Sequence, residues 1–275
     1  MATPIGNLED ITLRALRILK EVDLIAAEDT RRTKKLLAHY GIERPLTSYH
    51  GYNERPKSSA LVNRLRTGCY IALVSDAGTP ILSDPGFRLV REAIRAGVPV
   101  VPVPGPSALT AVLSASGLAA ERFAFEGFLP ARKVERRERL RGLRDEKRTL
   151  VFYEAPHRVR ASLQDLLEVL GDREMVLGRE LTKVHEEFLR GRVSELMVQA
   201  KLREWRGEMT LVVRGSEGVR DSDRDKDLLR AEIRRLRREG MRVKEIAQLL
   251  GERFCFSKSE VYRLVLGEAK NHPIS

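Results

Sequence analysis

Residues 70–86 read YIALVSDAGTPILSDPG, a short apolar segment that runs directly into two turns rich in glycine and proline. Residues 70–74 have the length and composition of a buried parallel strand. Asp76 then places a carboxylate at the end of that strand, while Gly78 and Gly86 supply permissive backbone. Ligands of open parallel sheets bind where loops leave the carboxyl ends of the strands, so a polar ligand is expected here. The alternative is that the segment only turns the chain and caps the next helix.

Strands and helices alternate on both sides of this loop. Two further apolar runs, residues 22–27 and 98–103, are predicted strands. Amphipathic helices are predicted at residues 13–20, 33–40, 58–66 and 87–96, and a helix of small residues runs from Ser107 to Gly117. Such alternation builds an open parallel sheet, and residues 1–113 are therefore expected to form a parallel-sheet α/β domain.

A second α/β domain with a mixed sheet is expected over residues 114–215. Its predicted strands are residues 123–128, 149–153, 174–179 and 209–213, and its predicted helices are residues 157–170 and 193–205. Residues 216–227 read as a polar linker and residues 228–275 as a helical tail, with helices at 228–238, 243–250 and 258–266 that resemble a helix-turn-helix. The predicted fold class is thus α/β, with two α/β domains and a small helical appendage.

Composition limits the class of protein. Fifty Lys and Arg against 39 Asp and Glu give a formal charge of +11, which favours a polyanionic partner. Cys69 and Cys255 lack the spacing of a zinc site or a disulfide framework, so no metal is expected. No apolar run approaches the roughly 20 residues that span a bilayer, and no signal peptide is evident, so a cytoplasmic protein with no membrane partner is expected. Neither G-x-G-x-x-G nor a P-loop occurs, which disfavours dinucleotide binding and nucleotide hydrolysis.

Seven strings in a fixed order make a more specific resemblance. They are ATPIGNLEDIT (2–12), AEDTRRT (27–33), SDAGTPILSDPG (75–86), PVPGPSALTAVLSASGL (102–118), FEGFLP (125–130), YEAPHR (153–158) and RELTKVHEE (179–187). The series resembles the tetrapyrrole methylases, and among them the group that methylates small-subunit ribosomal RNA. The resemblance implies two α/β domains that hold S-adenosylmethionine in the cleft between them. It also implies a homodimer that methylates the ribose 2′-oxygen of a cytidine in the decoding region of 16S rRNA.

The cofactor-binding residues that the resemblance implies come from both domains. They are Ile5, Asp76, Thr79, Ser107 and Ala108 in the first domain and Tyr153, Leu181 and Thr210 in the second. Related sequences have a short apolar strand before ATPIGN, whereas Met1 stands here where that strand should end. Loss of the strand is expected to expose neighbouring strand edges and to loosen Ile5, and an overlooked upstream start codon is the alternative.

Glu28 and Asp29 are the first candidates for the general base that accepts the hydroxyl proton. They follow the predicted strand 22–27 at its carboxyl end, although Asp29 could instead cap the next helix. A second candidate group surrounds His185 and a third surrounds His157. For the His185 group the alternative is a salt-bridged loop, and structural roles are favoured for both histidines.

Basic side chains near the loops are candidates for RNA contact. Residues 131–148 contain nine Lys or Arg against four acids, which favours phosphate binding over a merely solvated helix face. The candidate RNA-binding residues are Arg31, Arg32, Arg132, Lys133, Arg136, Arg137 and Arg158. The arginine-rich tail could contact rRNA or pack on a partner subunit. The partner is expected to be naked rRNA or, more readily, the assembled 30S subunit.

Two other functions remain open on the sequence. Relatives of the same fold methylate tetrapyrroles or a protein, but they usually have a G-x-G-P-G-D first loop, which is absent here. The chain could also be a non-enzymatic RNA-binding module, which would bind no cofactor. Binding of S-adenosylmethionine and the identity of the methylated product distinguish the three.

Overall fold

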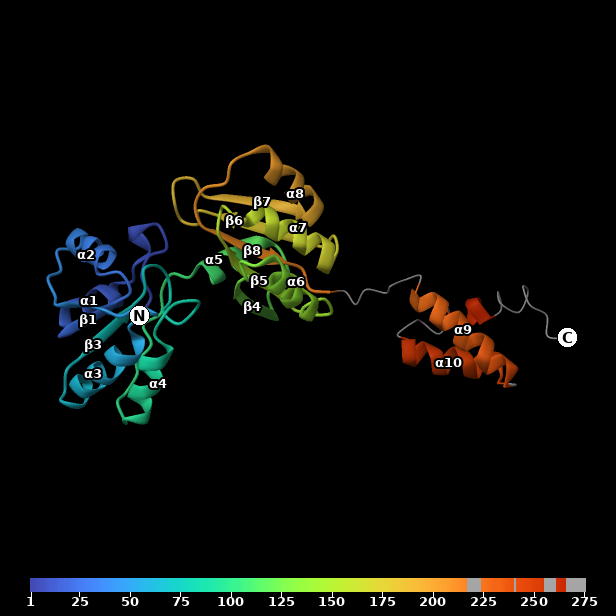
Figure 1. Ribbon diagram of the computed structural model, residues 1–275, viewed down its shortest axis with the longest axis horizontal. Helices are drawn as coiled ribbons and strands as arrows, with labels where there is room; N and C mark the ends of the chain where they lie inside the picture. Colours follow the sequence, from blue (N-terminus) through green and yellow to red (C-terminus); the bar gives the residue numbers. More distant parts are fainter. Residues whose placement is uncertain (217–223, 240, 255–260, 266–275) are drawn as a thin grey trace. The chain divides into compact units, whose positions relative to one another are not determined.

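The computed structural model describes residues 1–216, 224–239, 241–254 and 261–265 (Figure 1). Residues 1–216 form one compact unit, and residues 217–275 belong to a second. Among the helices within these ranges, none combines the length and apolar character needed to cross a bilayer.

The first half of the larger unit, here the N-terminal lobe, is built on a parallel sheet of strand order β2–β1–β3. The strands are β1 (Leu24–Ala27), β2 (Leu46–Ser48) and β3 (Ile71–Val74). Its helices are α1 (Leu13–Glu21), α2 (Thr30–His39), α3 (Glu54–Arg66) and α4 (Phe87–Arg95), and η1 (Leu8–Asp10) is a short 3-10 turn. All four predicted helices and the predicted strands 22–27 and 70–74 are present, with ends within about four residues of those predicted, and the parallel sheet is confirmed. Strand β2 was not predicted.

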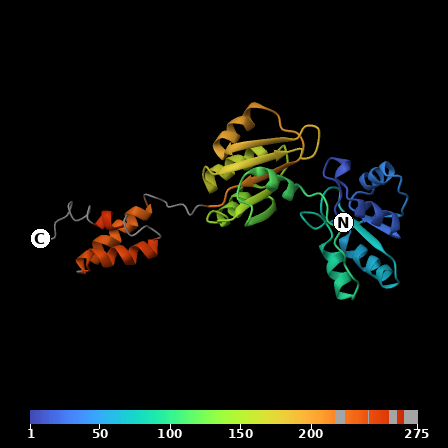
Figure 2. The same cartoon turned by 180° about the vertical axis from the view of Figure 1, so that it is seen from behind.

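Both faces of this sheet are covered by helices, because successive side chains of β1 point to opposite sides. Ile25 and Ala27 pack with residues of α1 and α2, whereas Leu24 and Ala26 pack with residues of α3 and α4. Both views show the helices on either side of the strands (Figure 1, Figure 2). Because the three strands are parallel, their carboxyl ends meet at one edge of the sheet, where the loops carrying Glu28 and Asp76 begin.

The predicted strand 98–103 is wrong. The Val98 amide donates to the Ala93 carbonyl, the Val103 carbonyl accepts from the Ala2 amide, and no strand pairs along the segment in the described structure. The β-branched composition suggested a strand, but a strand needs a hydrogen-bonded neighbour along its length. Val103 is buried, but Val100 and Val101 are 44% and 72% exposed, so the run is not buried along its length as the prediction required.

The C-terminal lobe is built on a mixed five-stranded sheet of order β4–β5–β8–β6–β7, in which only β4 and β5 are parallel. The strands are β4 (Phe123–Phe128), β5 (Thr149–Glu154), β6 (Glu174–Arg179), β7 (Glu187–Arg192) and β8 (Met209–Val213). The helices α6 (Lys133–Gly142), α7 (Val159–Leu170) and α8 (Val193–Leu202) contribute to the hydrophobic core on one face. The mixed sheet is confirmed; β7 at its edge was not predicted.

Helix α5 (Ala108–Ser116) covers the other face of the five-stranded sheet. Leu109 and Val112 belong to one hydrophobic cluster with Val151 and Val212 of the sheet. Because α5 packs on this sheet, we propose that the domain boundary lies before Ala108 rather than at the predicted position between residues 113 and 114.

The helical unit has its own small core. Helices α9 (Arg224–Arg238) and α10 (Val243–Phe254) and the helical residues 261–265 contribute buried Leu, Ile and Val side chains to one cluster. The first two helices of the predicted tail are present. Of the predicted third helix, 258–266, residues 261–265 are described and helical, and the other residues lie outside the described ranges. Residues 217–223 of the predicted linker, 216–227, also lie outside them, whereas residues 224–227 belong to α9 and not to a linker.

Candidate active site

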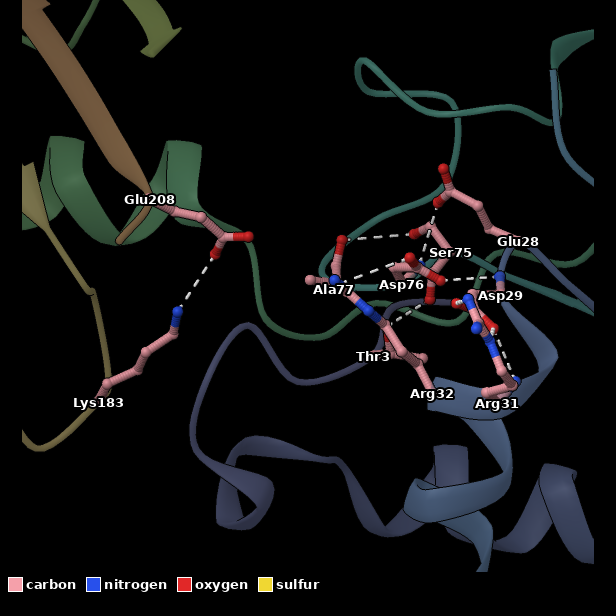
Figure 3. A network of polar contacts seen from close by, with 10 residues as sticks. All are labelled: Thr3, Glu28, Asp29, Arg31, Arg32, Ser75, Asp76, Ala77, Lys183 and Glu208. Carbon is pink, nitrogen blue, oxygen red and sulfur yellow. Dashed lines mark hydrogen bonds and ion pairs between the residues drawn. The ribbon is translucent and has the colours of Figure 1, made fainter. Parts of the chain in front are cut away.

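Three loops of the N-terminal lobe converge beside the edge of its sheet. The amide and carbonyl of Thr3 exchange hydrogen bonds of 2.9 Å with those of Gly78, whose φ of 75° places it in the left-handed region. The Thr3 hydroxyl donates to the Ser75 carbonyl at 3.1 Å (Figure 3). A Cβ added at Gly78 would lie 3.4 Å from Ile5 Cγ2 and 3.9 Å from the Pro106 carbonyl oxygen. The loop at residues 2–7, the loop after β3 and the loop before α5 thus come together.

An apolar wall joins these loops to the C-terminal lobe. Ile5 and Leu181 are buried in one hydrophobic cluster, and Ala108 and Tyr153 pack against it. The Tyr153 ring meets Phe125 and Phe128 edge-on, with centroids 4.8 and 5.6 Å apart. Burial raises the pKa of the Tyr153 hydroxyl, which interacts with Ser107 and the Leu109 backbone. Four residues proposed to bind the cofactor therefore share this wall.

The remaining cofactor candidates lie close by. Thr210 is buried opposite Tyr153 in the β5–β8 pairing. Ser107 stands at the N-cap of α5 without a side-chain capping hydrogen bond, so its hydroxyl is not used for capping. Thr79 is half-buried in the same loop as Asp76. Ile5, expected to be loosened, is 9% exposed and packed in the wall.

The Asp76 carboxylate connects the loop after β3 to the start of α2 (Figure 3). Its Oδ1 accepts from the Asp29 amide at 2.9 Å, and its Oδ2 lies 3.5 Å from Arg32 Nη1. The Asp76 amide in turn donates to Glu28 Oε2 at 3.2 Å. Glu28, Asp29 and Asp76 are therefore brought together at the carboxyl ends of β1 and β3, as their sequence positions predicted.

The two candidate bases differ in their environment. Asp29 caps α2 by accepting from the Arg31 amide at 2.8 Å, and its Oδ2 lies 2.8 Å from Arg31 Nη2. Hydrogen bonds from the Arg31 side chain and backbone lower the pKa of Asp29 to about 2. Burial, with the neighbouring charge of Asp76, raises the pKa of Glu28. Glu28 is the better proton acceptor, since a weakly acidic carboxyl forms the more basic carboxylate.

Asp84 is a site residue that the sequence analysis left without a role. Burial, and then the charge of Glu28, raises its pKa to about 6. Its carboxyl group interacts with the Ser75 side chain of its own lobe, and the negative charge of Glu208 in the C-terminal lobe also raises its pKa. The signal in the sequence was the second Ser-Asp pair, Ser83–Asp84, which repeats Ser75–Asp76 within one loop.

Backbone strain is concentrated in two loops at this junction. Over the described ranges, the non-glycine residues with positive φ are Ile81 (79°), Ser83 (69°), Glu180 (51°) and Thr182 (66°). The first two belong to the loop after β3 and the others to the loop between β6 and β7. A β-branched residue such as Ile81 is rarely found there, and such strain gathers at binding sites.

The loop between β6 and β7 closes over the first loop of the chain. The Asn7 amide donates to Thr182 Oγ1 at 3.1 Å. Lys183 Nζ lies 3.4 Å from Glu208 Oε2 (Figure 3) and 2.8 Å from Glu180 Oε1. The aliphatic stem of Lys183 covers Gly6. We call this set of contacts the lobe latch. The group around His185 thus corresponds to the salt-bridged alternative.

The candidate RNA-binding residues divide into exposed side chains and side chains that are largely buried. Arg31 and Arg32, in the first turn of α2, have side chains 87% and 63% exposed. Arg132 and Lys133, at the start of α6, are also exposed. These residues remain candidates for phosphate contact.

Arg136 is a correction to the predicted RNA surface. It is only 4% exposed, and its Nη2 lies 2.7 Å from Oδ2 of the buried Asp165. Arg137 is ion-paired with Glu168, and Arg158 is largely buried, with its guanidinium donating to the Leu129 carbonyl. Burial gives Arg136 a structural role that a count of basic residues does not reveal.

Comparisons with known proteins agree with this geometry. Residues 2–197 match the family model of the tetrapyrrole (corrin/porphyrin) methylases. Solved structures with the same fold include uroporphyrin-III-C-methyltransferase from Thermus thermophilus (TM-score 0.55, 23% identity, 78% of this chain and 91% of that one). Diphthine synthase is another (TM-score 0.57, 17% identity, 77% of this chain and 87% of that one). The chain belongs to the tetrapyrrole methylase family.

Sequence relatives define the group within that family. The chain is 48% identical over 267 residues to ribosomal RNA small subunit methyltransferase I of Escherichia coli O157:H7, covering 96% of this chain and 92% of the relative. It is 44% identical over 272 residues to the protein of that name from Pasteurella multocida, covering 96% and 94%. Its group is therefore that of ribosomal RNA small subunit methyltransferase I, and the chain is a methyltransferase.

The residues at the junction fit S-adenosylmethionine, the methyl donor of this family. The apolar wall of Ile5, Leu181 and Tyr153 suits the adenosine part, and the carboxylates near Asp76 suit an ammonium or sulfonium charge. Throughout the described chain, no group of His, Cys, Asp and Glu is arranged to hold a metal ion.

Proposed function

We propose that this chain transfers the methyl group of S-adenosylmethionine to the ribose 2′-oxygen of a cytidine in small-subunit ribosomal RNA. The observation that supports it best is the position of Glu28. This carboxylate, whose pKa is raised, stands beside the exposed Arg31 and Arg32, at the edge of the sheet where the cofactor candidates meet. A candidate proton acceptor, candidate phosphate-binding arginines and the cofactor candidates thus lie at one edge of the sheet. The relatives are named for small-subunit rRNA, which supports RNA as the substrate.

The cofactor, the candidate base and the arginines each have a separate role in methyl transfer. S-adenosylmethionine supplies a methyl group on a sulfonium leaving group when it is bound. Ile5, Thr79, Ser107 and the other cofactor candidates position it, and Glu28 accepts the proton of the ribose hydroxyl. Arg31, Arg32, Arg132 and Lys133 contact RNA phosphates. We further propose a cytoplasmic homodimer that acts on the 30S subunit or its rRNA.

The test compares Glu28→Gln with Asp29→Asn in methyl transfer from labelled S-adenosylmethionine to unmethylated small subunits. Glutamine keeps an oxygen that can accept from the Asp76 amide but removes the base, so kcat should fall about 100-fold or more with unchanged cofactor affinity. Asp29→Asn retains an N-cap residue, so its kcat should fall by less than about tenfold.

Three outcomes would contradict the proposal. Full activity of Glu28→Gln would show that Glu28 is not the proton acceptor. Absence of transfer to small subunits by the parent, with label instead entering a tetrapyrrole or a protein, would show that the substrate is wrong. No cofactor binding by the folded parent would leave only a non-enzymatic RNA-binding module.

A further inference from the structure

The turn between β2 and α3 presents a fully exposed aromatic ring. Tyr52 has a relative exposure of 101%, and its one ring contact within the described residues is an edge-on approach to His50, with centroids 6.2 Å apart. A single exposed aromatic residue is ordinary on protein surfaces. Its meaning depends on how the ring is held and what lies beside it.

The turn that carries this ring is held by the side chain of Asn53. The His50 amide donates to Asn53 Oδ1 at 2.9 Å, and Asn53 Nδ2 lies 3.1 Å from His50 Nε2 and 3.3 Å from Ser48 Oγ. These bonds join the end of β2 to the start of α3 across the turn. A ring on a fixed turn loses little freedom when a ligand stacks on it.

Hydrogen bonds fix the same turn to the candidate active site. The Tyr49 amide donates to the Ala27 carbonyl at 2.7 Å, and Glu28 is the next residue after Ala27. Glu54 Oε1 accepts from the Gly86 amide at 2.6 Å, which ties the start of α3 to the loop after β3. Tyr52 is three positions after Tyr49, a reach of at most about 11 Å. Tyr52 therefore lies at the same edge of the sheet as Glu28.

Exposed arginines begin two helices at this edge of the sheet. Arg31 and Arg32 open α2, next to the end of β1, and Arg55 lies in the first turn of α3. Arg55 is exposed and has no ion pair among the described residues. Proteins bind single-stranded nucleic acid with exposed aromatic rings and arginines on one surface: the ring stacks on a base and the guanidinium groups contact phosphates.

We propose that Tyr52 stacks on an unpaired base of the RNA strand that contains the methylated ribose, and so positions that strand beside Glu28. The inference rests on the proposed function for the identity of the strand. It assigns the enzyme a substrate segment whose bases are splayed out, because a base within a duplex is already stacked on its neighbours.

The test uses three variants of the full chain. Tyr52→Ala removes the ring, Tyr52→Trp keeps a stacking surface, and Tyr70→Ala is the matched control. Tyr70 is 74% exposed but stands just before β3, at the opposite end of the strands from Glu28. Two quantities are measured: kcat and KM with small subunits, and the Kd of a single-stranded RNA oligonucleotide containing 2-aminopurine, whose fluorescence reports stacking.

Stacking of one base on an aromatic ring contributes about 1–3 kcal/mol, so Tyr52→Ala should raise KM and the oligonucleotide Kd by about 5- to 150-fold. Quenching of 2-aminopurine should also be lost. Tyr52→Trp should restore the affinities and the quenching, and Tyr70→Ala should match the parent. The Kd for S-adenosylmethionine should be the same in all four proteins, since Tyr52 is not among the cofactor candidates.

The outcomes separate this inference from the proposed function. Parent-like KM, Kd and quenching in Tyr52→Ala would overturn the inference while methyl transfer by the parent upholds the function. Equal losses in Tyr70→Ala would also overturn it, because the effect would not be local to this turn. Tyr52-dependent quenching in a parent that transfers no methyl group to small subunits would uphold the inference and contradict the function.

Discussion

Gly6→Ala tests whether the lobe latch holds the first loop in a binding geometry. A Cβ at Gly6 would lie 2.8 Å from Lys183 Cε, closer still to Lys183 Cγ, and 3.1 Å from the Leu181 carbonyl oxygen. Real Cβ atoms do not approach carbon so closely, so the Lys183 stem must leave. Its departure breaks ion pairs with Glu180 and Glu208 that are partly solvent-exposed.

The size of the effect follows from two contributions. Forcing a methyl group into a filled space costs about 1–3 kcal/mol. The two ion pairs, screened by solvent, add at most about 1 kcal/mol each and can re-form elsewhere. Ile5 is the neighbour of Gly6 in the chain, and Leu181 lies two residues before Lys183. Both are proposed to contact the cofactor. We therefore expect the Kd for S-adenosylmethionine to rise by about 5- to 150-fold.

Isothermal titration with S-adenosylmethionine measures this change, and Gly142→Ala is the control. Gly142 ends α6, and a Cβ there would meet no atom within 4 Å. If Lys183 is the obstacle, Gly6→Ala combined with Lys183→Ala should bind nearly as well as Lys183→Ala alone. Parent-like affinity in Gly6→Ala, or no recovery in the double variant, would refute the reasoning.

Two further predictions concern stability. Asp84 has a pKa of about 6 in the folded protein, above the roughly 3.9 of an unfolded aspartate, so its contribution to stability is full below about pH 4 and is lost as pH rises through about 6. Asp84→Asn should therefore gain stability over the parent as pH rises from about 4 to 8 in urea unfolding, and a pH-independent difference would contradict this. Arg136→Ala leaves Asp165 buried without its main partner and should lower the free energy of unfolding by about 3–5 kcal/mol, towards the lower figure because Arg137 Nε lies 3.7 Å away. Arg132→Ala, at an exposed position, should change it by less than about 0.5 kcal/mol, and equal losses in the two variants would show that Arg136 is not structural.

The strands that were predicted correctly are those whose burial is evident in the chain itself. Residues 209–213 form β8, the central strand of its sheet, and all of its side chains are buried. β2 is three residues long and β7 has the edge-strand sequence EFLRGR, so neither has a run of buried apolar side chains to reveal it. Residues 98–103 show the converse error, since an apolar run indicates burial but cannot supply a partner strand.

The residues of the candidate site that could be predicted from the sequence are those that directly follow a strand. Glu28 and Asp76 met because parallel strands bring their carboxyl ends to one edge. The contrast between Glu28 and Asp29 was not predictable, because it depends on which side chain Arg31 contacts. The burial of Arg136 depends on Asp165, 29 residues further along the chain. Residue type and spacing give the charge of a side chain but not its partner.

The strained residues Ile81, Ser83, Glu180 and Thr182 have a consequence for laboratory evolution. Glycine at any of them would relieve the backbone, and selection for thermostability would accept changes that ease these two loops. The same changes would let the loops relax away from the positions in which they meet the apolar wall. Variants of this enzyme chosen only for heat resistance should therefore be enriched in substitutions that make it a slower methyltransferase.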